Sequence, residues 1–402
     1  MSQPPFGTPP QAPQAPQAPH APQAPQGAHP NPFAQGAPHP SQLGQPAPHP
    51  SQLGQPAPHP SQLGQPAPHP SQMGGAPWQP PAPANPAVPA PDASHVARCV
   101  EQFRRVHHNM RQVILGKDEV IERMLWAIAA SGHILFRDVP GVGKTMLAKA
   151  FAASVSGTFR RVQFTPDILP MDITGSNVFN VRSKAFEFVK GPVFTNVLLA
   201  DEINRAPPKT QSALLEVMEE RQVTVEGTTH KIEPPFVTLA TMNPLDDEGT
   251  YALPAAQMDR FMMMLSVGYP PPQAEAQMLE VHLAPNPILA DISPVVTMED
   301  VRDWQATAKR VYVAPEIRNY IVTLMGAIRQ DSRNLRSLSP RSSLMLARAC
   351  QARALFANRH FVHVDDVKVL APDVLGHRIM TGDSSVGREL VQQWLARVPA
   401  PA

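Results

Sequence analysis

The stretch RDVPGVGKTMLAKA, residues 137–150, contains most of a phosphate-binding loop. The P-loop template reads GxxxxGK followed by serine or threonine. Gly143, Lys144 and Thr145 match this template, whereas Asp138 replaces its first glycine. The apolar run HILF before the loop predicts a strand, and the residues after the lysine predict a helix. Strand, loop and helix is the context in which such a loop binds phosphate, although an ordinary strand-to-helix turn has the same outline.

The residue types in this loop suit the phosphates of a nucleotide. Glycines let backbone amides approach the phosphate oxygens, and the N-terminus of the following helix favours an anion. Lys144 would place a positive charge on the β- and γ-phosphates, and the Thr145 hydroxyl would be a ligand for Mg²⁺. Asp138 is tolerable because its side chain, at the end of the strand, can point away from the phosphates. We therefore predict that a nucleotide is bound by Pro140, Gly141, Val142, Gly143, Lys144, Thr145 and Met146.

A second motif, NVLLADEINRAPPKTQSALLEVMEERQVTVEG at residues 196–227, begins with an apolar strand that ends in two acids. Asp201 would hold the Mg²⁺ ion, and Glu202 would polarise the water that attacks the γ-phosphate. Two acids after an apolar run are also common at solvated strand ends and helix caps. Their position downstream of a P-loop favours the catalytic interpretation, in which Thr145 and Asp201 bind the metal.

Three further polar residues lie next to predicted strands or helices. Asn243, at the end of FVTLATMN, is able to orient the attacking water, but a turn formed by Asn-Pro is an equal alternative. Arg260 in AAQMDRF precedes a strand, and Arg341 in LSPRSS begins a helix. Single arginines usually lie on the surface, so their residue type alone does not assign them a role.

Five short apolar runs predict the fold: HILFRD, RRVQF, NVLLADE, FVTLATMN and FMMMLSVG. Runs of this length without alternation are typical of strands buried on both faces of a parallel sheet. Stretches of helical periodicity separate them, including residues 93–112 and 144–157. The pattern predicts an α/β fold, a P-loop domain built on a parallel sheet.

The first 91 residues differ in composition from the rest of the chain: they hold 29 of the 50 prolines and no Asp, Glu, Lys or Arg. A ten-residue repeat, APHPSQLGQP, begins at Ala37 and recurs twice, and then a third time as APHPSQMGGA. Proline removes backbone donors, and a segment with few apolar side chains cannot offset its ordering entropy. We predict a disordered tail over residues 1–92. A multivalent ligand for a proline-binding partner and weak metal binding by the repeated histidines are alternatives.

Charge and cysteine content exclude several classes of protein. The formal net charge is +1, so no overall attraction to nucleic acid or anionic membranes is expected. Cys99 and Cys350 match no metal or redox spacing, which fits inert thiols in a reducing compartment. No signal-peptide pattern is present, and no apolar run approaches the roughly 20 residues of a membrane helix. We expect a cytoplasmic protein that neither binds nucleic acid nor inserts into a membrane.

The order of DVPGVGKT, GPVFTNVLLADEINRAPPKTQSALLEVMEERQVTV, PPFVTLATMNP, EGTYALPAAQMDRF and SPRSS closely resembles the MoxR-type AAA+ ATPases. The resemblance covers about residues 94–390. Members of that family also tend to carry Asp at the first P-loop position. The resemblance implies a nucleotide-binding domain over residues 93–272, a small helical lid over residues 273–390 and a C-terminal tail over residues 391–402.

By the same resemblance, Asn243 looks like sensor 1, Arg260 like an arginine finger that faces a neighbouring subunit, and Arg341 like sensor 2. The family resemblance also implies a hexameric ring and a von Willebrand factor A-type partner. Residues 178–191 and 221–232 alternate around a turn, and they resemble the two hairpins with which such ATPases contact clients. Solvent-facing hairpins that only finish the sheet are the alternative.

The function implied is ATP hydrolysis that drives chaperone-like remodelling or maturation of a client complex, including metal or cofactor insertion. A nucleic-acid motor and a non-hydrolysing scaffold recruited through the proline-rich tail are alternatives. The near-neutral net charge argues against the motor. The intact Lys144, Asp201 and Glu202 argue against the scaffold.

Deletion of residues 1–91 tests the interpretation of the tail. Because this segment has no charged side chains and no burial pattern, we expect its removal to leave the melting temperature and the basal ATPase rate nearly unchanged. Calorimetry and a phosphate-release assay on the full and shortened chains measure both quantities. A change in Tm of more than a few degrees would mean that the tail packs on the folded domain.

Overall fold

The computed structural model describes residues 91–243, 251–283, 292–331, 338–379 and 384–401. All of them belong to the second of two compact units, Gly75–Ala402. The repeats, and the predicted tail up to residue 90, lie outside the described residues. Within the described ranges, no helix combines the length and the apolar character needed to span a bilayer.

Five parallel strands form the central sheet of the described part of the chain, in the spatial order β2-β5-β8-β1-β9. The five apolar runs of the sequence become these strands, so the predicted α/β fold is confirmed. The interior strands β5 and β8 are buried on both faces, which is why their sequences do not alternate. The strands are β1 (Ile134–Arg137), β2 (Phe159–Gln163), β5 (Val197–Asp201), β8 (Val237–Met242) and β9 (Met263–Leu265).

The strand order brings the functional loops to one edge of the sheet. β1 pairs with β8, and β8 pairs with β5, all in parallel. The P-loop, Glu202 and Asn243 follow these three neighbouring strands, so they meet at the carboxyl edge of the sheet. Residues that precede a strand, such as His133 before β1 and Met262 before β9, lie at the opposite edge.

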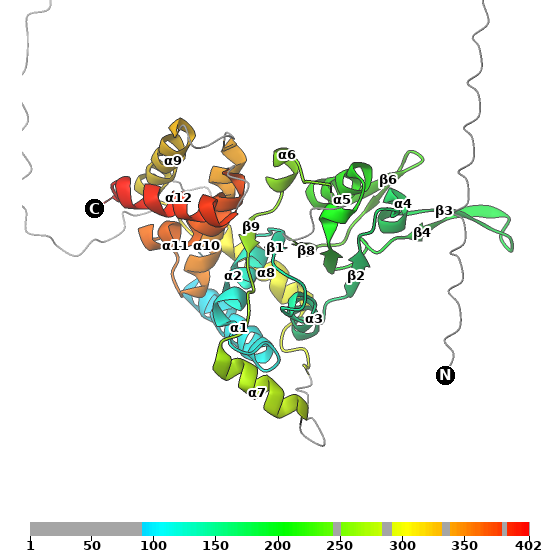
Figure 1. The fold of residues 1–402 in the computed structure, drawn as a ribbon, viewed down its shortest axis with the longest axis horizontal. Coiled ribbons are helices and arrows are strands. Elements are labelled where there is room, and N and C mark those ends of the chain that lie inside the picture. The colour runs from blue at the N-terminus through cyan, green and yellow to red at the C-terminus, as the bar shows by residue number, and fades with distance from the viewer. Residues whose placement is uncertain (1–90, 244–250, 284–291, 332–337, 380–383, 402) are drawn as a thin grey trace, which may run out of the picture. The chain divides into compact units, whose positions relative to one another are not determined.

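Two hydrophobic cores cover the two faces of the sheet. Ile134 and Phe136 of β1 belong to the first core, with α1, α2 and α3, whereas Leu135 belongs to the second core, with α5 (Figure 1). This alternation within β1 is the period of an extended strand covered on both sides. The helices of this part are α1 (Ala93–Arg111), α2 (Asp118–Ala129), α3 (Lys144–Ser154), α4 (Pro170–Thr174), α5 (Pro208–Glu220) and α6 (Ala255–Met258), with a 3₁₀ turn η1 (Ile203–Arg205).

The helical C-terminal part shares the first core with the α/β part. Phe356 of α10 stacks on Phe103 of α1, with ring centroids 4.2 Å apart, and Trp304 of α8 meets Phe356 edge-on at 5.5 Å. The predicted helical lid is therefore confirmed, and α1 joins it to the sheet. Its elements are α7 (Pro272–Leu283), α8 (Met298–Ala308), α9 (Pro315–Gln330), α10 (Pro340–Phe356), α11 (Val364–Leu375), η2 (Gly376–Arg378) and α12 (Ser384–Arg397).

Two antiparallel hairpins lie outside the central sheet, in the two segments where the sequence predicts them. They pair β3 (Gly175–Asn180) with β4 (Ala185–Lys190), and β6 (Gln222–Val225) with β7 (Thr228–Lys231). Gly175 has φ +92°, and a Cβ added there would lie 2.2 Å from the carbonyl oxygen of Val189, so the base of the first hairpin requires glycine. The β3–β4 hairpin exposes the apolar side chains of Val178, Phe179, Val181, Phe186 and Val189.

The buried carboxylate of Asp138 fixes the end of β1 to the segment that follows β9. Asp138 Oδ2 accepts a hydrogen bond from the backbone N of Val267 at 2.6 Å. Asp138 Oδ1 accepts from Ser266 Oγ at 2.7 Å and from the backbone N of Gly268 at 3.2 Å. The side chain therefore points away from the phosphate loop, as its position at the strand end predicts, and it has a structural role of its own.

Replacement of Asp138 tests this role. Asp138→Ala leaves the buried amide of Val267 and the part-buried amide of Gly268 without an acceptor, each worth about 1–3 kcal/mol, so we expect the free energy of unfolding to fall by about 2–4 kcal/mol. Asp138→Asn retains one acceptor oxygen and should lose less. Urea denaturation of the three proteins measures the difference. Equal stability of the wild type and Asp138→Ala would contradict it.

Candidate nucleotide-binding site

The P-loop adopts a backbone conformation that suits glycine. Gly141 and Gly143 have φ of +85° and +93°, and no atom lies within 4 Å of a Cβ added at either position. Conformation, not crowding, is therefore the reason for glycine here. Gly143 is the residue before the first turn of α3, which begins at Lys144, so the loop leads directly into a helix N-terminus that favours an anion.

A cavity of about 410 Å³ lies in front of this loop, at the carboxyl edge of the sheet. It brings together nearly all the residues that the sequence assigns to nucleotide and metal binding. Val142 is the exception, because its side chain packs against the first hydrophobic core. The cavity is lined by Pro140, Gly141, Gly143, Lys144, Thr145, Met146, Lys149, Arg161, Asp201, Glu202, Thr241 and Asn243.

Lys144 reaches back across its own loop. Its Nζ donates to the carbonyl oxygens of Asp138 at 2.8 Å and Val139 at 3.2 Å. Burial lowers the pKa of Lys144, and the charges of Asp138, Asp201 and Glu202 act in the opposite direction. The ammonium group is thus held at the cavity by neutral carbonyls, which a phosphate oxygen can replace with a stronger, charged acceptor.

Asp201 is buried at the end of β5 and is fully engaged. Its Oδ1 accepts from Thr241 Oγ1 at 2.5 Å. Its Oδ2 accepts from Arg161 Nε at 3.1 Å and from Arg161 Nη2 at 2.6 Å. The carboxylate therefore already faces a cation, and the sequence alone does not reveal that Arg161 of β2 supplies it. The only sequence signal for Arg161 was its place in the apolar run RRVQF.

The donor set of the cavity fits Mg²⁺. The hydroxyl of Thr145 and the carboxylate of Asp201 line the same cavity, and both are the hard oxygen ligands that this ion prefers. The guanidinium of Arg161 on Asp201 shows that a positive charge is accommodated at this carboxylate. Binding of the ion by Asp201 would compete with that ion pair.

Glu202 is held in a strained backbone conformation at the mouth of the cavity. Its φ of 58° lies in the left-handed region, which non-glycine residues rarely adopt. Its backbone N donates to Thr241 Oγ1 at 2.8 Å. Its Oε2 accepts from Gln163 Nε2 at 2.9 Å and lies 3.2 Å from Arg205 Nε. Thr241 therefore orients both acids, since it bonds the side chain of Asp201 and the backbone of Glu202.

Arg260 and Arg341 do not lie at this cavity. Both line a second cavity, of about 400 Å³, together with His133 and Met262 from the amino edge of the sheet. Glu219, near the end of α5, binds both arginines: Arg260 Nε lies 2.8 Å from its Oε2, and Arg341 Nη2 bonds its Oε1. The structure thus brings these two predicted residues to each other, and separates them from the P-loop of the same subunit.

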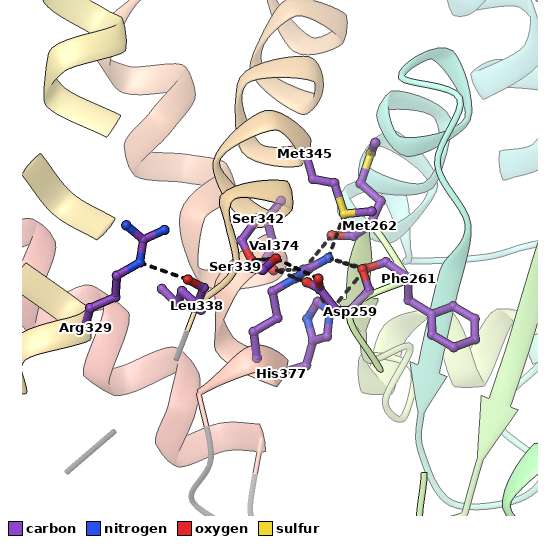
Figure 2. A network of polar contacts seen from close by, with 11 residues as sticks. Asp259, Phe261, Met262, Arg329, Leu338, Ser339, Ser342, Met345, Val374 and His377 are labelled. Atoms are coloured by element: carbon purple, nitrogen blue, oxygen red, sulfur yellow. Dashed lines mark hydrogen bonds and ion pairs between the residues drawn. The ribbon is translucent and has the colours of Figure 1, made fainter. Parts of the chain in front are cut away.

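A buried polar network holds the segments next to both arginines (Figure 2). Asp259, which precedes Arg260, accepts from Ser339 Oγ at 2.7 Å and from Arg378 Nε at 2.7 Å. Arg378 Nη2 also donates to the carbonyl oxygen of Phe261 at 2.6 Å. One guanidinium of η2 therefore fixes the start of β9 against the start of α10, and with it the relative position of Arg260 and Arg341.

Comparison with known proteins agrees with both parts of the fold. Residues 133–263 match the ATPase family associated with various cellular activities (AAA), and residues 328–393 match the AAA lid domain. The first match contains the P-loop, both acids and Arg260, and the second contains Arg341 and Arg378.

Curated relatives and a solved structure cover most of the chain. The uncharacterized protein YeaC of Bacillus subtilis is 44% identical over 69% of this chain and 86% of its own length. The chaperone MoxR1 of Mycobacterium tuberculosis is 38% identical over 76% of this chain and 84% of its own length. The crystal structure of a proposed ATPase from Cytophaga hutchinsonii, 35% identical, superimposes with a TM-score of 0.71 over 77% of this chain and 98% of that chain. With its P-loop, paired acids and helical lid, the chain belongs to the MoxR family of AAA ATPases.

Proposed function

We propose that this protein is a Mg²⁺-dependent ATPase that uses ATP hydrolysis to remodel or mature a client protein complex. The observation that carries the proposal is the cavity in which Lys144, at the start of α3, meets Asp201 and Glu202, at the end of β5. ATPase activity in general follows from the family, and the Mycobacterium tuberculosis relative is named a chaperone. Insertion of a metal or cofactor into the client is part of the proposal by family resemblance.

The residues of the cavity that the sequence predicts have separate roles in this proposal. The P-loop amides and Lys144 bind the β- and γ-phosphates. Thr145 and Asp201 would hold Mg²⁺, which neutralises phosphate charge when bound. Glu202 accepts a hydrogen bond from the attacking water and takes its proton, and Asn243 orients the same water from the end of β8. The carboxylate of Glu202 must leave Gln163 and Arg205 to do so.

Two substitutions separate binding from hydrolysis. Lys144→Ala removes a charge that contacts phosphates before the reaction, so it should weaken ATP binding as well as turnover. Glu202→Gln retains the P-loop and Asp201, so it should bind ATP with near-normal affinity while the hydrolysis rate falls by a factor of about 10² to 10⁴, the usual contribution of a positioned base. Nucleotide titration and phosphate release measure the two effects. Equal loss of affinity in both variants would contradict these assignments.

We further propose that the active site is shared between subunits of a hexameric ring. Arg260 and Arg341 lie at the opposite edge of the sheet from the P-loop, bound to Glu219 of their own subunit. In a ring that places this edge against a neighbour, both guanidinium groups could exchange Glu219 for the γ-phosphate of the neighbour's nucleotide. They would stabilise the charge that spreads over the phosphoryl oxygens in the transition state.

Mixed subunits test this arrangement. Arg260→Ala should retain ATP binding and lose hydrolysis by on the order of 10³ to 10⁵, because an arginine finger acts mainly in the transition state. Mixing Arg260→Ala with Glu202→Gln should restore part of the turnover, since a subunit with intact Glu202 can receive Arg260 from its neighbour. Specific activity should also rise with protein concentration. Concentration-independent activity, and no restoration in mixtures shown to co-assemble, would overturn the proposal.

The β3–β4 hairpin is the surface that we propose for client contact. It exposes five large apolar side chains, including Phe179 and Phe186, whose rings meet edge-on at 5.4 Å. Apolar side chains gathered on a narrow exposed element are typical of interaction sites. A von Willebrand factor A-type partner, expected from the family resemblance, would connect the ATPase to its client.

A further inference from the structure

The second cavity contains more positive charge than its two predicted arginines supply. Of the side chains that line its roughly 400 Å³, four are arginines and one is a glutamate. They come from the end of α5, the segment before β9 and the first turns of α10. Burial lowers the pKa of the neighbouring His133 to about 4, so its ring is neutral at pH 7. We call this site the arginine cavity; its charged residues are Glu219, Arg221, Arg260, Arg341 and Arg348.

Glu219 compensates only part of this charge. It binds Arg260 and Arg341, and these hydrogen bonds lower the pKa of its carboxyl group. Arg221 and Arg348 have no acidic partner within the described ranges, and Arg221 makes only a 3.5 Å contact with the carbonyl oxygen of Ser131. Like charges held together without a counter-ion are unfavourable. The cavity is therefore complementary to an anion that this subunit does not contribute from its described residues.

Arg221 has a backbone conformation that is unfavourable for a residue with a side chain. Arg221 caps the C-terminus of α5 with φ 53°, ψ 36°, in the left-handed region. Glycine usually takes this position, because a side chain there costs about 1 kcal/mol or more. Burial lowers the pKa of Arg221, and the positive charge of Arg348 lowers it further. Both side chains line the same cavity. Arg221 therefore combines backbone strain, partial burial and a like-charged neighbour.

The spacing along α10 gives the cavity its length. Arg341, Leu344, Met345 and Arg348 all line it, which is the spacing of residues on one face of a helix. Arg341 and Arg348 are two turns apart, so their backbone positions lie about 10 Å apart along the helix. The guanidinium groups can therefore contact several oxygens of an extended anion, and not only a single phosphate group.

We propose that Arg221 and Arg348 are two further phosphate-binding residues of the site shared between subunits, and that they contact the polyphosphate chain of the nucleotide bound at the neighbouring subunit's P-loop. The inference rests on the proposed ring, and it adds two residues to Arg260 and Arg341. Arg260 would act on charge that develops in the transition state. Arg348 lies two turns from Arg341 and would contact phosphate oxygens before the reaction, which raises the affinity of the assembled ring for ATP.

Arg348 is the better residue to test, because it is exposed and its loss should not disturb folding. We expect Arg348→Ala to raise the KM for ATP about tenfold, within the range of a charged hydrogen bond, and to lower kcat less than Arg260→Ala does. Arg348→Lys, which keeps the charge, should recover part of the affinity. Arg318→Ala, at an exposed arginine of α9 outside the cavity, is the matched control and should behave as wild type.

A mixture of two variants shows which subunit uses Arg348. Lys144→Ala subunits bind ATP poorly but carry an intact arginine cavity. Mixed with Arg348→Ala subunits, they should restore the low KM, because each Arg348→Ala P-loop then faces an intact neighbour. Size-exclusion chromatography verifies that the two variants co-assemble. A mixture of Lys144→Ala with Arg260→Ala subunits tests whether the active site is shared between subunits of the ring.

The outcomes separate the two levels of the proposal. Suppose that the mixture of Lys144→Ala with Arg260→Ala regains turnover, but the mixture of Lys144→Ala with Arg348→Ala does not regain the low KM. This result would support the shared active site and overturn the role of Arg348. Absence of restoration in both would overturn the ring and, with it, this inference. A KM of Arg348→Ala equal to that of Arg318→Ala would also overturn it, as would tight binding of inorganic phosphate to the cavity of isolated subunits.

Discussion

The position of β1 between β8 and β9 is the constraint on which both cavities depend. Because all three strands are parallel, their carboxyl ends place the P-loop beside Asn243, while their amino ends place His133 beside Met262. The buried carboxylate of Asp138 secures this order, since it accepts hydrogen bonds from the chain that leaves β9. The aspartate that departs from the P-loop template therefore stabilises the sheet that positions the P-loop.

The two edges of the sheet carry different sets of charged residues. The carboxyl edge holds Lys144, Asp201 and Glu202, and the amino edge holds Arg260 and Arg341. Within one chain these two sets of residues line different cavities. In the proposed ring, charge on the γ-phosphate would meet the arginines across a subunit boundary. Within one subunit, Arg161 pairs with Asp201, and Glu219 pairs with Arg260 and Arg341. The proposed assembly would have to exchange these ion pairs for contacts with Mg²⁺ and phosphate.

The helical lid takes part in this arrangement through buried polar contacts. Arg378 lies almost completely buried between the lid and the sheet, and its burial lowers its pKa while Asp259 opposes the change. Its bonds to Asp259 and to the carbonyl oxygen of Phe261 hold η2 against the segment before β9, and Ser339 at the N-terminus of α10 bonds the same Asp259 (Figure 2). A movement of the lid would therefore displace Arg260 and Arg341 together.

The sequence by itself determined the local chemistry and the class of fold. The P-loop, the acidic pair at the end of β5 and the five apolar runs are short patterns of neighbouring residues. From these patterns alone the sequence predicts the parallel sheet and the segments at its carboxyl edge. Only the tertiary structure decided which distant side chains meet. Arg161 faces Asp201 across two paired strands, and Glu219 joins arginines that lie 41 and 122 positions away in the sequence. Such pairings follow from strand order and helix packing, which no local period encodes, and so the arginine cavity could be found only in the folded chain.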